Sequence, residues 1–190
     1  MDLTLETGRA TVRCEVCEGT QLVRGAYGRL AQCRECGYVL YPERPAGTPR
    51  DIYREGYFLR EEYLDYPSQR RTLARNFQRY LRLMRRFGAT TGRLFEVGCA
   101  YGFFLAEARR HFDVEGSEFC AAAAAAARQA FGFRVSSEEF PSLQPAEPYD
   151  VVCMWDTIEH LFRPRAYLRK AHEVLKPDGW LFLTTGDIGS

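Results

Sequence analysis

Residues 94–102 read LFEVGCAYG, and this stretch decides the predicted fold. Residues 94–97 form a short apolar run, as expected for a strand buried in a parallel sheet. Small residues at positions 98, 100 and 102 then let a ligand approach the backbone where the strand turns into a helix. A helical stretch follows over residues 102–112. A glycine loop of this kind fits many nucleotide ligands, so the rest of the chain must narrow the choice.

After residue 94 the chain alternates between strand and helix signals. Alternation of this kind implies a parallel sheet with helices on both faces. We therefore predict an α/β fold, with a Rossmann-like, mostly parallel sheet of five strands and helices on both faces. Besides the strand at 94–97 and the helix at 102–112, the predicted strands are 112–116, 133–135, 149–155 and 180–184, and the predicted helices are 121–131 and 164–175.

Acidic residues at the ends of two predicted strands indicate the ligand, because open parallel sheets bind ligands beyond the carboxyl ends of their strands. Glu96 would repel the pyrophosphate of a dinucleotide and attract a positively charged ligand. S-adenosylmethionine carries a sulfonium and an ammonium and has no phosphate. Glu118, 22 residues after Glu96, follows the next strand at the spacing of an acid that binds ribose hydroxyls. The two acids together favour S-adenosylmethionine.

From about Tyr53 to its last residue the sequence resembles the class I S-adenosylmethionine-dependent methyltransferases. The resemblance is carried by FEVGCAYG at 95–102, Glu118, YDVVCMWDTIEH at 149–160 and LKPDGW at 175–180. It implies the fold of that family and an enzyme that uses this cofactor. One departure is Ala100, where the family commonly has glycine. Alanine costs little there if its backbone dihedral angles are ordinary.

The resemblance also implies the residues of the cofactor site. Glu96 and the loop at 98–102 hold the methionine part, Glu118 binds both ribose hydroxyls, and Phe119 lies against the adenine. Ser137, Glu138 and Glu139 are the candidates for contact with the adenine amino group, and Glu138 enters the predicted set. The predicted cofactor-binding residues are Glu96, Gly98, Cys99, Ala100, Tyr101, Gly102, Glu118, Phe119, Glu138 and Asp156.

The segment after the fourth predicted strand supplies the candidate catalytic residues. A Glu159-His160 pair at this point recurs in small-molecule O- and C-methyltransferases of the family. Methyl transfer is an in-line displacement at a sulfonium, so positioning supplies most of the catalysis, and a base is needed only when the acceptor loses a proton. His160 is the candidate base, with Asp156 lining the same pocket. The alternative for His160 is a helix residue that hydrogen-bonds the backbone.

Four of the seven cysteines form a separate motif near the N-terminus. They make two CxxC pairs with fifteen residues between them, which is the spacing of a structural zinc site with four thiolates. Four ligands leave no open position for a catalytic water. The alternatives are two unrelated thiol pairs, or a redox CxxC that would need no second pair at this spacing. The predicted zinc ligands are Cys14, Cys17, Cys33 and Cys36.

These cysteines belong to a predicted zinc ribbon with short strands at 21–23 and 29–32, joined by a turn at 25–28. Gly37 directly after the second pair, and Gly19 one residue later after the first, suit the backbone turns of such a site. The other cysteines are isolated and are predicted to be small core residues. They are Cys99, Cys120 and Cys153.

Between ribbon and sheet, residues 41–66 combine prolines with many aromatic residues, which predicts a connector. Its aromatic side chains either take part in ordinary packing or form a lid over a ligand. From residue 68, apolar residues at helical spacing among seven arginines predict an amphipathic helix that ends at Gly88. Its arginine face is either solvated or contacts RNA or a phosphorylated substrate. The predicted domains are the ribbon at 1–45, the connector and helix at 46–88, and the S-adenosylmethionine-binding domain at 89–190.

Composition excludes several functional classes. Runs without charged or strongly polar residues, such as the alanine tract at 121–127, are far short of the roughly 20 residues of a membrane-spanning helix. The N-terminus is acidic and lacks an apolar core segment, so we expect no secretion signal and a cytoplasmic protein. With 26 basic and 25 acidic residues the net charge is +1, without the basic excess of nucleic-acid binders.

The leading hypothesis is a methyltransferase that acts on a small molecule such as a sugar or another metabolite, because a ribbon before this fold is similar to a subgroup with such substrates. An RNA methyltransferase that grips its substrate with the ribbon is one alternative, although residues 156–158 lack the Asn-Pro-Pro-aromatic sequence of many amino-methylating nucleic-acid enzymes. A non-catalytic S-adenosylmethionine-binding or interaction module is another. The residues do not specify the acceptor or whether its oxygen, nitrogen or carbon is methylated.

The strand at 180–184 is expected to be an open sheet edge, because family sheets add an antiparallel pair beyond this point. Either the chain is a fragment of a longer protein that ends after its fifth strand, or a second copy or another chain covers the edge.

Overall fold

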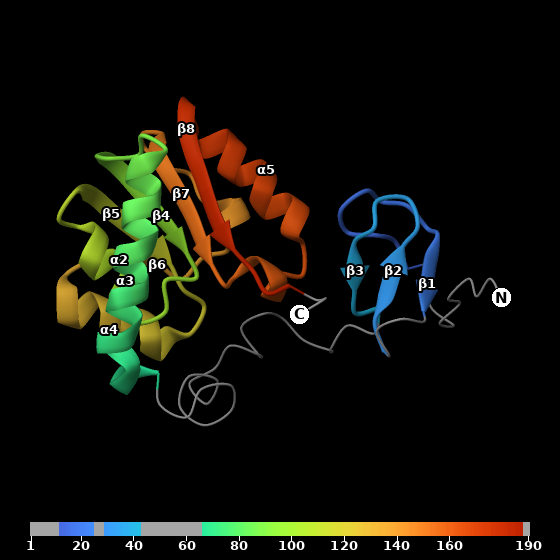
Figure 1. Cartoon of the computed structure of the whole chain (residues 1–190), viewed down its shortest axis with the longest axis horizontal. Helices are drawn as coiled ribbons and strands as arrows, with labels where there is room; N and C mark the ends of the chain where they lie inside the picture. The colour runs from blue at the N-terminus through green and yellow to red at the C-terminus, as the bar shows by residue number, and fades with distance from the viewer. Residues whose placement is uncertain (1–11, 25–28, 43–65, 188–190) are drawn as a thin grey trace. The chain divides into compact units, whose positions relative to one another are not determined.

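The computed structural model describes residues 12–24, 29–42 and 66–187 (Figure 1). They fall into two compact units, one with a three-stranded sheet and the other with a five-stranded sheet. Most of the expected connector, residues 43–65, and the expected turn at 25–28 lie outside the described residues. Within the described ranges, no helix combines the length and the apolar character that crossing a membrane requires.

The small sheet is antiparallel and has the order β1-β2-β3. Its first two strands lie close to the predicted ones, and the third is an addition that pairs Val39 with Gln32. Leu22, Ala31 and Leu40 pack against buried cysteines in its core. The strands are β1 (Leu22–Arg24), β2 (Ala31–Cys33) and β3 (Val39–Leu40).

The large sheet has the order β6-β5-β4-β7-β8, and all four neighbouring pairs are parallel. The predicted fold class, a parallel Rossmann-like sheet with helices, is therefore confirmed. Its strands are β4 (Gly92–Val97), β5 (Phe112–Ser117), β6 (Arg134–Ser136), β7 (Tyr149–Trp155) and β8 (Leu175–Thr184). The helices are α2 (Arg70–Arg86), α3 (Phe103–Ala108), α4 (Ala121–Phe131) and α5 (Pro164–Val174), with short 3₁₀ turns η2 (Pro67–Gln69), η3 (Phe140–Ser142) and η4 (Ile158–His160).

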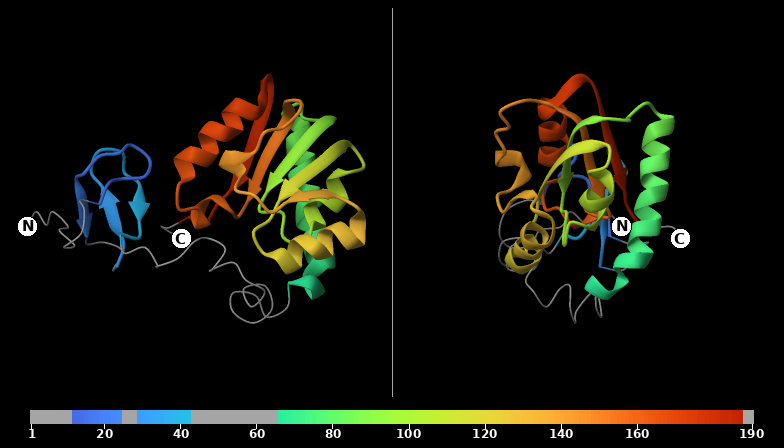
Figure 2. Two further views of the ribbon diagram at one scale, coloured as in Figure 1. Left: turned by 180° about the vertical axis from the view of Figure 1, so that it is seen from behind. Right: turned by 90° about the vertical axis from the view of Figure 1, so that its left-hand side faces the viewer.

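Strand β4 lies at the centre of the sheet and is buried on both faces. Leu94 packs into a core with α2, α3 and α4, whereas Phe95 and Val97 pack into a second core with α5. The helices α2 and α5 accordingly lie on opposite faces (Figure 2). Helix α4 approaches closely because small alanines, such as the fully buried Ala124, face the sheet. The mainly apolar run from which this strand was predicted thus reflects two-sided burial, and Glu96 is its one charged residue.

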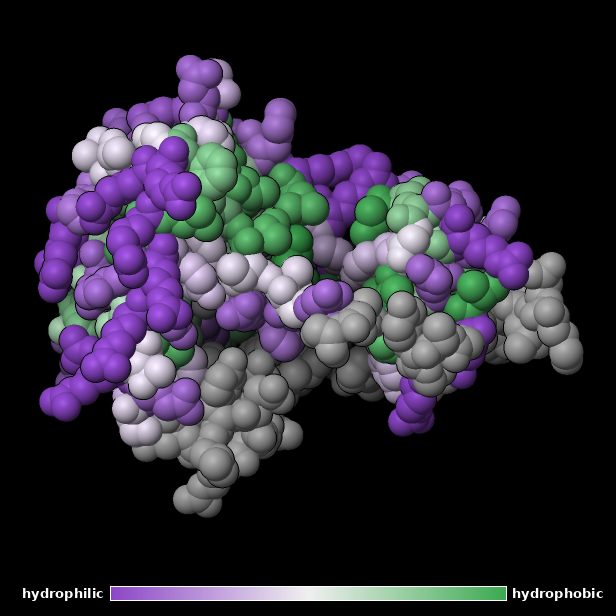
Figure 3. All heavy atoms as spheres, in the orientation of Figure 1, coloured by the Kyte–Doolittle hydropathy of each residue, from purple (hydrophilic) through white to green (hydrophobic). Residues whose placement is uncertain are grey.

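Helix α2 belongs to the core of this unit. Phe77, Leu81 and Met84 are buried against the sheet, and the arginines lie on the outer side, where hydrophilic side chains gather (Figure 3). The helix itself begins at Arg70, because the predicted start at residue 68 falls in the 3₁₀ turn η2 that Pro67 opens. The amphipathic pattern was therefore correctly assigned to a helix.

Strand β8 begins at Leu175, five residues before the predicted start at 180. Leu175 pairs with Tyr149, but the next regular pair joins Trp180 to Val151, so residues 176–179 form an irregularity in the strand. Among the described residues β8 pairs only with β7, and a hydrophobic area lies over it (Figure 3). Phe87, 53% exposed, contributes to this area beside Trp180.

Gly102 and Gly132 provide a matched test of backbone strain and packing. Their φ angles are +73° and +72°, a region in which an L side chain costs about 1–2 kcal/mol. A Cβ at Gly102 would lie 3.1 Å from the Cβ of Ala127 and 3.3 Å from the ring of Phe133, whereas one at Gly132 would meet nothing within 4 Å. In urea unfolding, Gly132→Ala should lose about 1 kcal/mol and Gly102→Ala about 2–3 kcal/mol. Equal losses would contradict this account of the loop.

Candidate functional site

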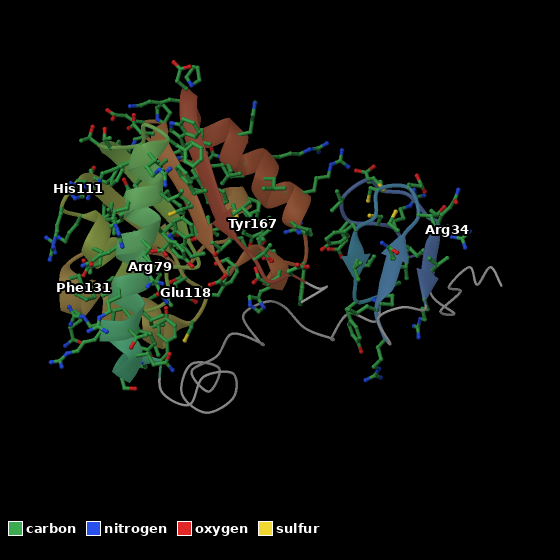
Figure 4. The ribbon with its side chains drawn as sticks, viewed as in Figure 1. Arg34, Arg79, His111, Glu118, Phe131 and Tyr167 are labelled. Carbon is green, nitrogen blue, oxygen red and sulfur yellow. The ribbon has the colours of Figure 1, made fainter. Side chains whose placement is uncertain are left out.

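One cavity of about 270 Å³ lies at the carboxyl ends of β4, β5 and β7. Side chains from α2, α3 and α5 complete its lining; Glu118, which follows β5, and Tyr167 on α5 are labelled in Figure 4. Three predicted residues do not line it: Tyr101, which stacks on Tyr66 with ring centroids 5.9 Å apart, Gly102 and the exposed Glu138. The predicted residues that the structure brings together around it are Glu96, Gly98, Cys99, Ala100, Glu118, Phe119, Asp156 and His160.

The loop after β4 turns through three residues with positive φ angles. Gly98, Ala100 and Gly102 have φ angles of +73°, +46° and +73°. The N–H groups of Gly98 and Cys99 both donate to the carbonyl of Ser117 at 2.9 Å, which ties the loop to β5. The condition under which alanine would cost little is therefore not met: Ala100 has a left-handed backbone, which costs about 1–2 kcal/mol. This explains why glycine suits the position.

Glu118 holds this loop with both oxygens of its carboxylate. The N–H of Ala100 donates to Oε2 at 2.8 Å, and the N–H of Cys120 donates to Oε1 at 2.7 Å. Burial raises the pKa of Glu118, while hydrogen bonds from the Cys120, Ala100 and Phe119 N–H groups act in the opposite direction. Because each carboxylate oxygen has two lone pairs, this carboxylate can still accept hydrogen bonds from a ligand in the cavity.

Glu96 is the second buried acid of the cavity. Its side chain is 4% exposed, and its Oε2 atom has no hydrogen-bond partner among the described residues. The neighbouring strand positions offer none, because Glu96 stands between Gly116 on β5 and Cys153 on β7. Burial, and then the charge of Glu118, raise the pKa of Glu96 well above its usual range. A buried acceptor without a donor suits a ligand that brings a donor or a positive charge.

The three isolated cysteines are buried, as predicted for core residues. Burial raises the pKa values of Cys99 and Cys153 well above the usual range, and the charge of Glu96 is the next cause for both. Both therefore remain thiols at neutral pH. Cys99 also lines the cavity, beside Gly116, where a Cβ would lie 3.1 Å from the cysteine Cβ and Sγ atoms.

The segment after β7 contains the candidate catalytic residues. Asp156 has a φ angle of +47°, and its N–H donates to Oγ1 of Thr184 at 3.0 Å. The Thr184 hydroxyl donates in turn to Oδ1 of Asp156 at 2.9 Å. His160 ends the turn η4, where its N–H donates to the carbonyl of Thr157 at 3.0 Å, and its half-buried side chain lines the cavity. Asp156 and His160 thus share one pocket.

Sequence reasoning missed one wall of the cavity. Leu73, Asn76, Phe77 and Tyr80 line it from α2, and the ring of Tyr80 stacks on Trp155 with centroids 4.5 Å apart. The sequence contained a signal for this wall, because these four residues share one helix face at i, i+3, i+4 and i+7. The apolar spacing was used only to predict an amphipathic helix, and neither Asn76 nor Tyr80 was given a role. The other missed lining residues are Tyr66, Val97, Phe104, Ser117, Phe140, Trp155, Thr157, Leu161 and Tyr167.

The four N-terminal cysteines lie close together in the small unit. Their sulfur atoms all lie within 4.8 Å of one another, with Cys14 and Cys36 at 3.6 Å and Cys17 and Cys33 at 3.5 Å. A tetrahedral zinc ion with bonds of about 2.3 Å places its sulfurs about 3.8 Å apart. The four side chains therefore fit one zinc ion.

The two CxxC turns have equivalent backbones. The residues that follow the pairs, Glu18 and Gly37, have φ angles of +67° and +78°, and their N–H groups donate to Cys14 and Cys33 carbonyls at 2.9 Å. Gly19, expected to serve the first turn, has another use. A Cβ there would lie 2.1 Å from Oε1 of Glu35, so this glycine makes room for a carboxylate.

Comparison with known proteins identifies the family of the large unit. A family model described as a methyltransferase domain matches residues 66–188. A ubiquinone biosynthesis O-methyltransferase of Caulobacter vibrioides is 32% identical over 100 residues, which cover 48% of this chain and 40% of that protein.

Solved structures share the fold. The N-methyltransferase NodS of Bradyrhizobium japonicum, in complex with S-adenosylhomocysteine, is 21% identical with a TM-score of 0.50, over 57% of this chain and 59% of that one. CalS10, an amino pentose methyltransferase of Micromonospora echinaspora with bound S-adenosylmethionine, is 22% identical with a TM-score of 0.50, over 63% and 50%. The match covers less than two thirds of each of these relatives.

If the cysteine cluster is a structural zinc site, the purified chain should contain about one zinc per molecule by elemental analysis. The double variant Cys33→Ser, Cys36→Ser should lose it. Cys120→Ala, which removes a buried thiol of the large unit, should keep it. Retention of zinc by the double variant would contradict the site.

Glu96→Gln should stabilise the empty protein at neutral pH. A glutamate in an unfolded chain has a pKa of about 4.3, whereas folding raises the pKa of Glu96. The folded state binds this proton more tightly, so the contribution of Glu96 to wild-type stability is most favourable below about pH 4.3 and falls as the pH rises towards the folded pKa. Glutamine cannot ionise, and its gain should reach about 1–3 kcal/mol at pH 8 and vanish near pH 4.

Thermal unfolding across this pH range measures the effect. Glu147→Gln, which changes an exposed glutamate, serves as the matched control and should follow the wild-type profile. A Glu96→Gln profile parallel to that of the wild type would show that Glu96 does not titrate abnormally.

Proposed function

This chain belongs to the methyltransferase domain family, and from that premise we propose that it transfers a methyl group from S-adenosylmethionine to a small molecule, such as a sugar or another metabolite. The similarity to the ubiquinone biosynthesis O-methyltransferase supports a small-molecule acceptor. The absence of lysine and arginine from the described cavity lining argues against a phosphate-bearing dinucleotide as the cofactor.

The observation that carries the proposal is the unpartnered carboxylate of Glu96. S-adenosylmethionine carries an ammonium and a sulfonium, so it brings both the hydrogen-bond donors and the positive charge that this buried acid lacks. Its ammonium would bind at Glu96, beside the backbone of residues 98–100, which have no side chain larger than a cysteine. An anionic ligand at the same place would be repelled by Glu96 and Glu118.

The remaining parts of the cofactor are assigned to residues that follow β5 and β6. Glu118 would accept hydrogen bonds from the ribose hydroxyls through its remaining lone pairs. Phe119, which lines the cavity and is half-buried, would pack against the adenine. Ser137, Glu138 and Glu139 remain the candidates for the adenine amino group, with Glu138 exposed next to β6. In the small unit, the four cysteines would hold a structural zinc ion.

The chemistry proposed for the chain is positioning and proton removal. The bound cofactor supplies an electrophilic methyl group on a positively charged sulfur. The walls from α2 and β7 align the acceptor for in-line displacement and keep water away. Where the acceptor is a hydroxyl or an ammonium, His160 takes up the proton on its imidazole. Asp156, fixed by Thr184, lines the same pocket and limits the positions that the acceptor can take.

Glu118→Gln tests the cofactor site. The substitution keeps one carbonyl oxygen for the loop but removes the charge and half of the acceptor capacity, so calorimetry should show at least about tenfold weaker binding of S-adenosylmethionine. Glu147→Gln, on the exposed surface, should bind as the wild type does.

Methyl transfer is tested with a methyl-labelled cofactor, incubated with sugars, phenols and amines. Label should appear in a small-molecule product. Unchanged cofactor binding by a folded Glu118→Gln protein would contradict the proposed site, and binding without any labelled product would contradict the proposed transfer.

A further inference from the structure

One wall of the cavity is aromatic. Phe77 and Tyr80 contribute to it from α2, Phe104 from α3 and Trp155 from the end of β7. Trp155 is packed between the others, with ring centroids 4.5 Å from Tyr80 and 5.2 Å from Phe104. Such a wall offers flat apolar area and suits the ring of an acceptor.

The charged side chains of the cavity are acidic. Among the described lining residues the carboxylates are Glu96, Glu118 and Asp156, and none is a lysine or an arginine. S-adenosylmethionine adds two positive groups and one carboxylate, so the acids still outnumber its excess positive charge. A phosphate or carboxylate on the acceptor would meet repulsion and no cationic partner.

Two arginines of this unit contact groups that do not line the cavity. The Arg70 guanidinium lies over the rings of Phe103 and Phe131, at 5.8 and 5.1 Å from their centroids. Arg128 donates to the carbonyl of Val135 from Nε at 3.0 Å and from Nη2 at 2.6 Å. Among the described residues, no arginine of α2 lines the cavity.

Two neutral polar groups on α2 complete the wall. Asn76 and Tyr80 stand at i and i+4, so their side chains are neighbours on one helix face, and both line the cavity. Neither side chain has a hydrogen-bond partner within residues 12–24, 29–42 and 66–187. The amide of Asn76 and the hydroxyl of Tyr80 can each donate and accept, which suits a hydroxyl, an amine or a carbonyl on a neutral ring.

We infer that the acceptor is a ring compound without phosphate or carboxylate, neutral or amine-bearing, that packs on Tyr80 and Trp155 and is recognised through Asn76 and the Tyr80 hydroxyl. This inference rests on the proposed function, because it assigns to the acceptor the space that the cofactor leaves. It selects phenols, aromatic amines and similar rings over nucleotide-linked sugars and RNA. Asn76 and Tyr80 become specificity-determining residues of the site.

The test uses three probes of similar shape: 4-methylcatechol, dopamine and 3,4-dihydroxyphenylacetate, which are neutral, amine-bearing and carboxylate-bearing. Each is titrated into the full chain saturated with S-adenosylhomocysteine, whose own binding is measured first. The neutral and amine-bearing probes should bind at least about tenfold more tightly than the carboxylate. Asn76→Ala and Tyr80→Phe should weaken that binding by about three- to tenfold without changing the Kd of the cofactor product.

Arg75→Ala, on the exposed face of the same helix, is the matched control and should change neither affinity. Asn76→Lys should reverse the preference towards the carboxylate probe, because it places a cation in the wall. Tighter binding of the carboxylate by the wild type, no binding of any probe, or unchanged affinity in both Asn76→Ala and Tyr80→Phe would overturn the inference. Failure of S-adenosylhomocysteine itself to bind would instead overturn the proposed function.

Discussion

The site depends on one carboxylate that holds two backbone N–H groups. Glu118 accepts from Ala100 at 2.8 Å and from Cys120 at 2.7 Å, so it joins the loop after β4 to the start of α4. Because these bonds are buried and charge-assisted, they are stronger than ordinary backbone contacts. These bonds maintain the left-handed backbone of Ala100 and the close approach of the loop to β5. They thereby maintain the shape of the cavity.

Several features of the site oppose the stability of the fold. Glu96 is a buried acid with an unpartnered oxygen, and Ala100 and Asp156 have positive φ angles without being glycine. Each costs free energy that the cores on the two faces of the sheet must offset. Such costs are found together at one end of the sheet, whereas the opposite strand ends have ordinary pairs such as Asp150 with Lys176 at 2.8 Å. This concentration is itself a mark of a functional end.

The fold could be predicted because its signals are local: apolar runs set the strands, and glycines set the turns. The acids Glu96 and Glu118 could be predicted because the carboxyl ends of parallel strands meet at one edge of the sheet. The α2 wall was not found, because a helical pattern shows which residues face inward but not whether they meet a core or a cavity. The early start of β8 at Leu175 depends on pairing with Tyr149, and the strain at Ala100 depends on the contacts of Glu118; neither is local in sequence.

The contact between Asp156 and Thr184 links the pocket to the neighbouring strand β8. Asp156 both donates to and accepts from the same hydroxyl of β8, so Asp156 cannot move away from that strand without breaking both bonds. The contact therefore ties the end of β8 to the segment that follows β7. A ligand that fixes the position of Asp156 would by the same contact stabilise this end of β8.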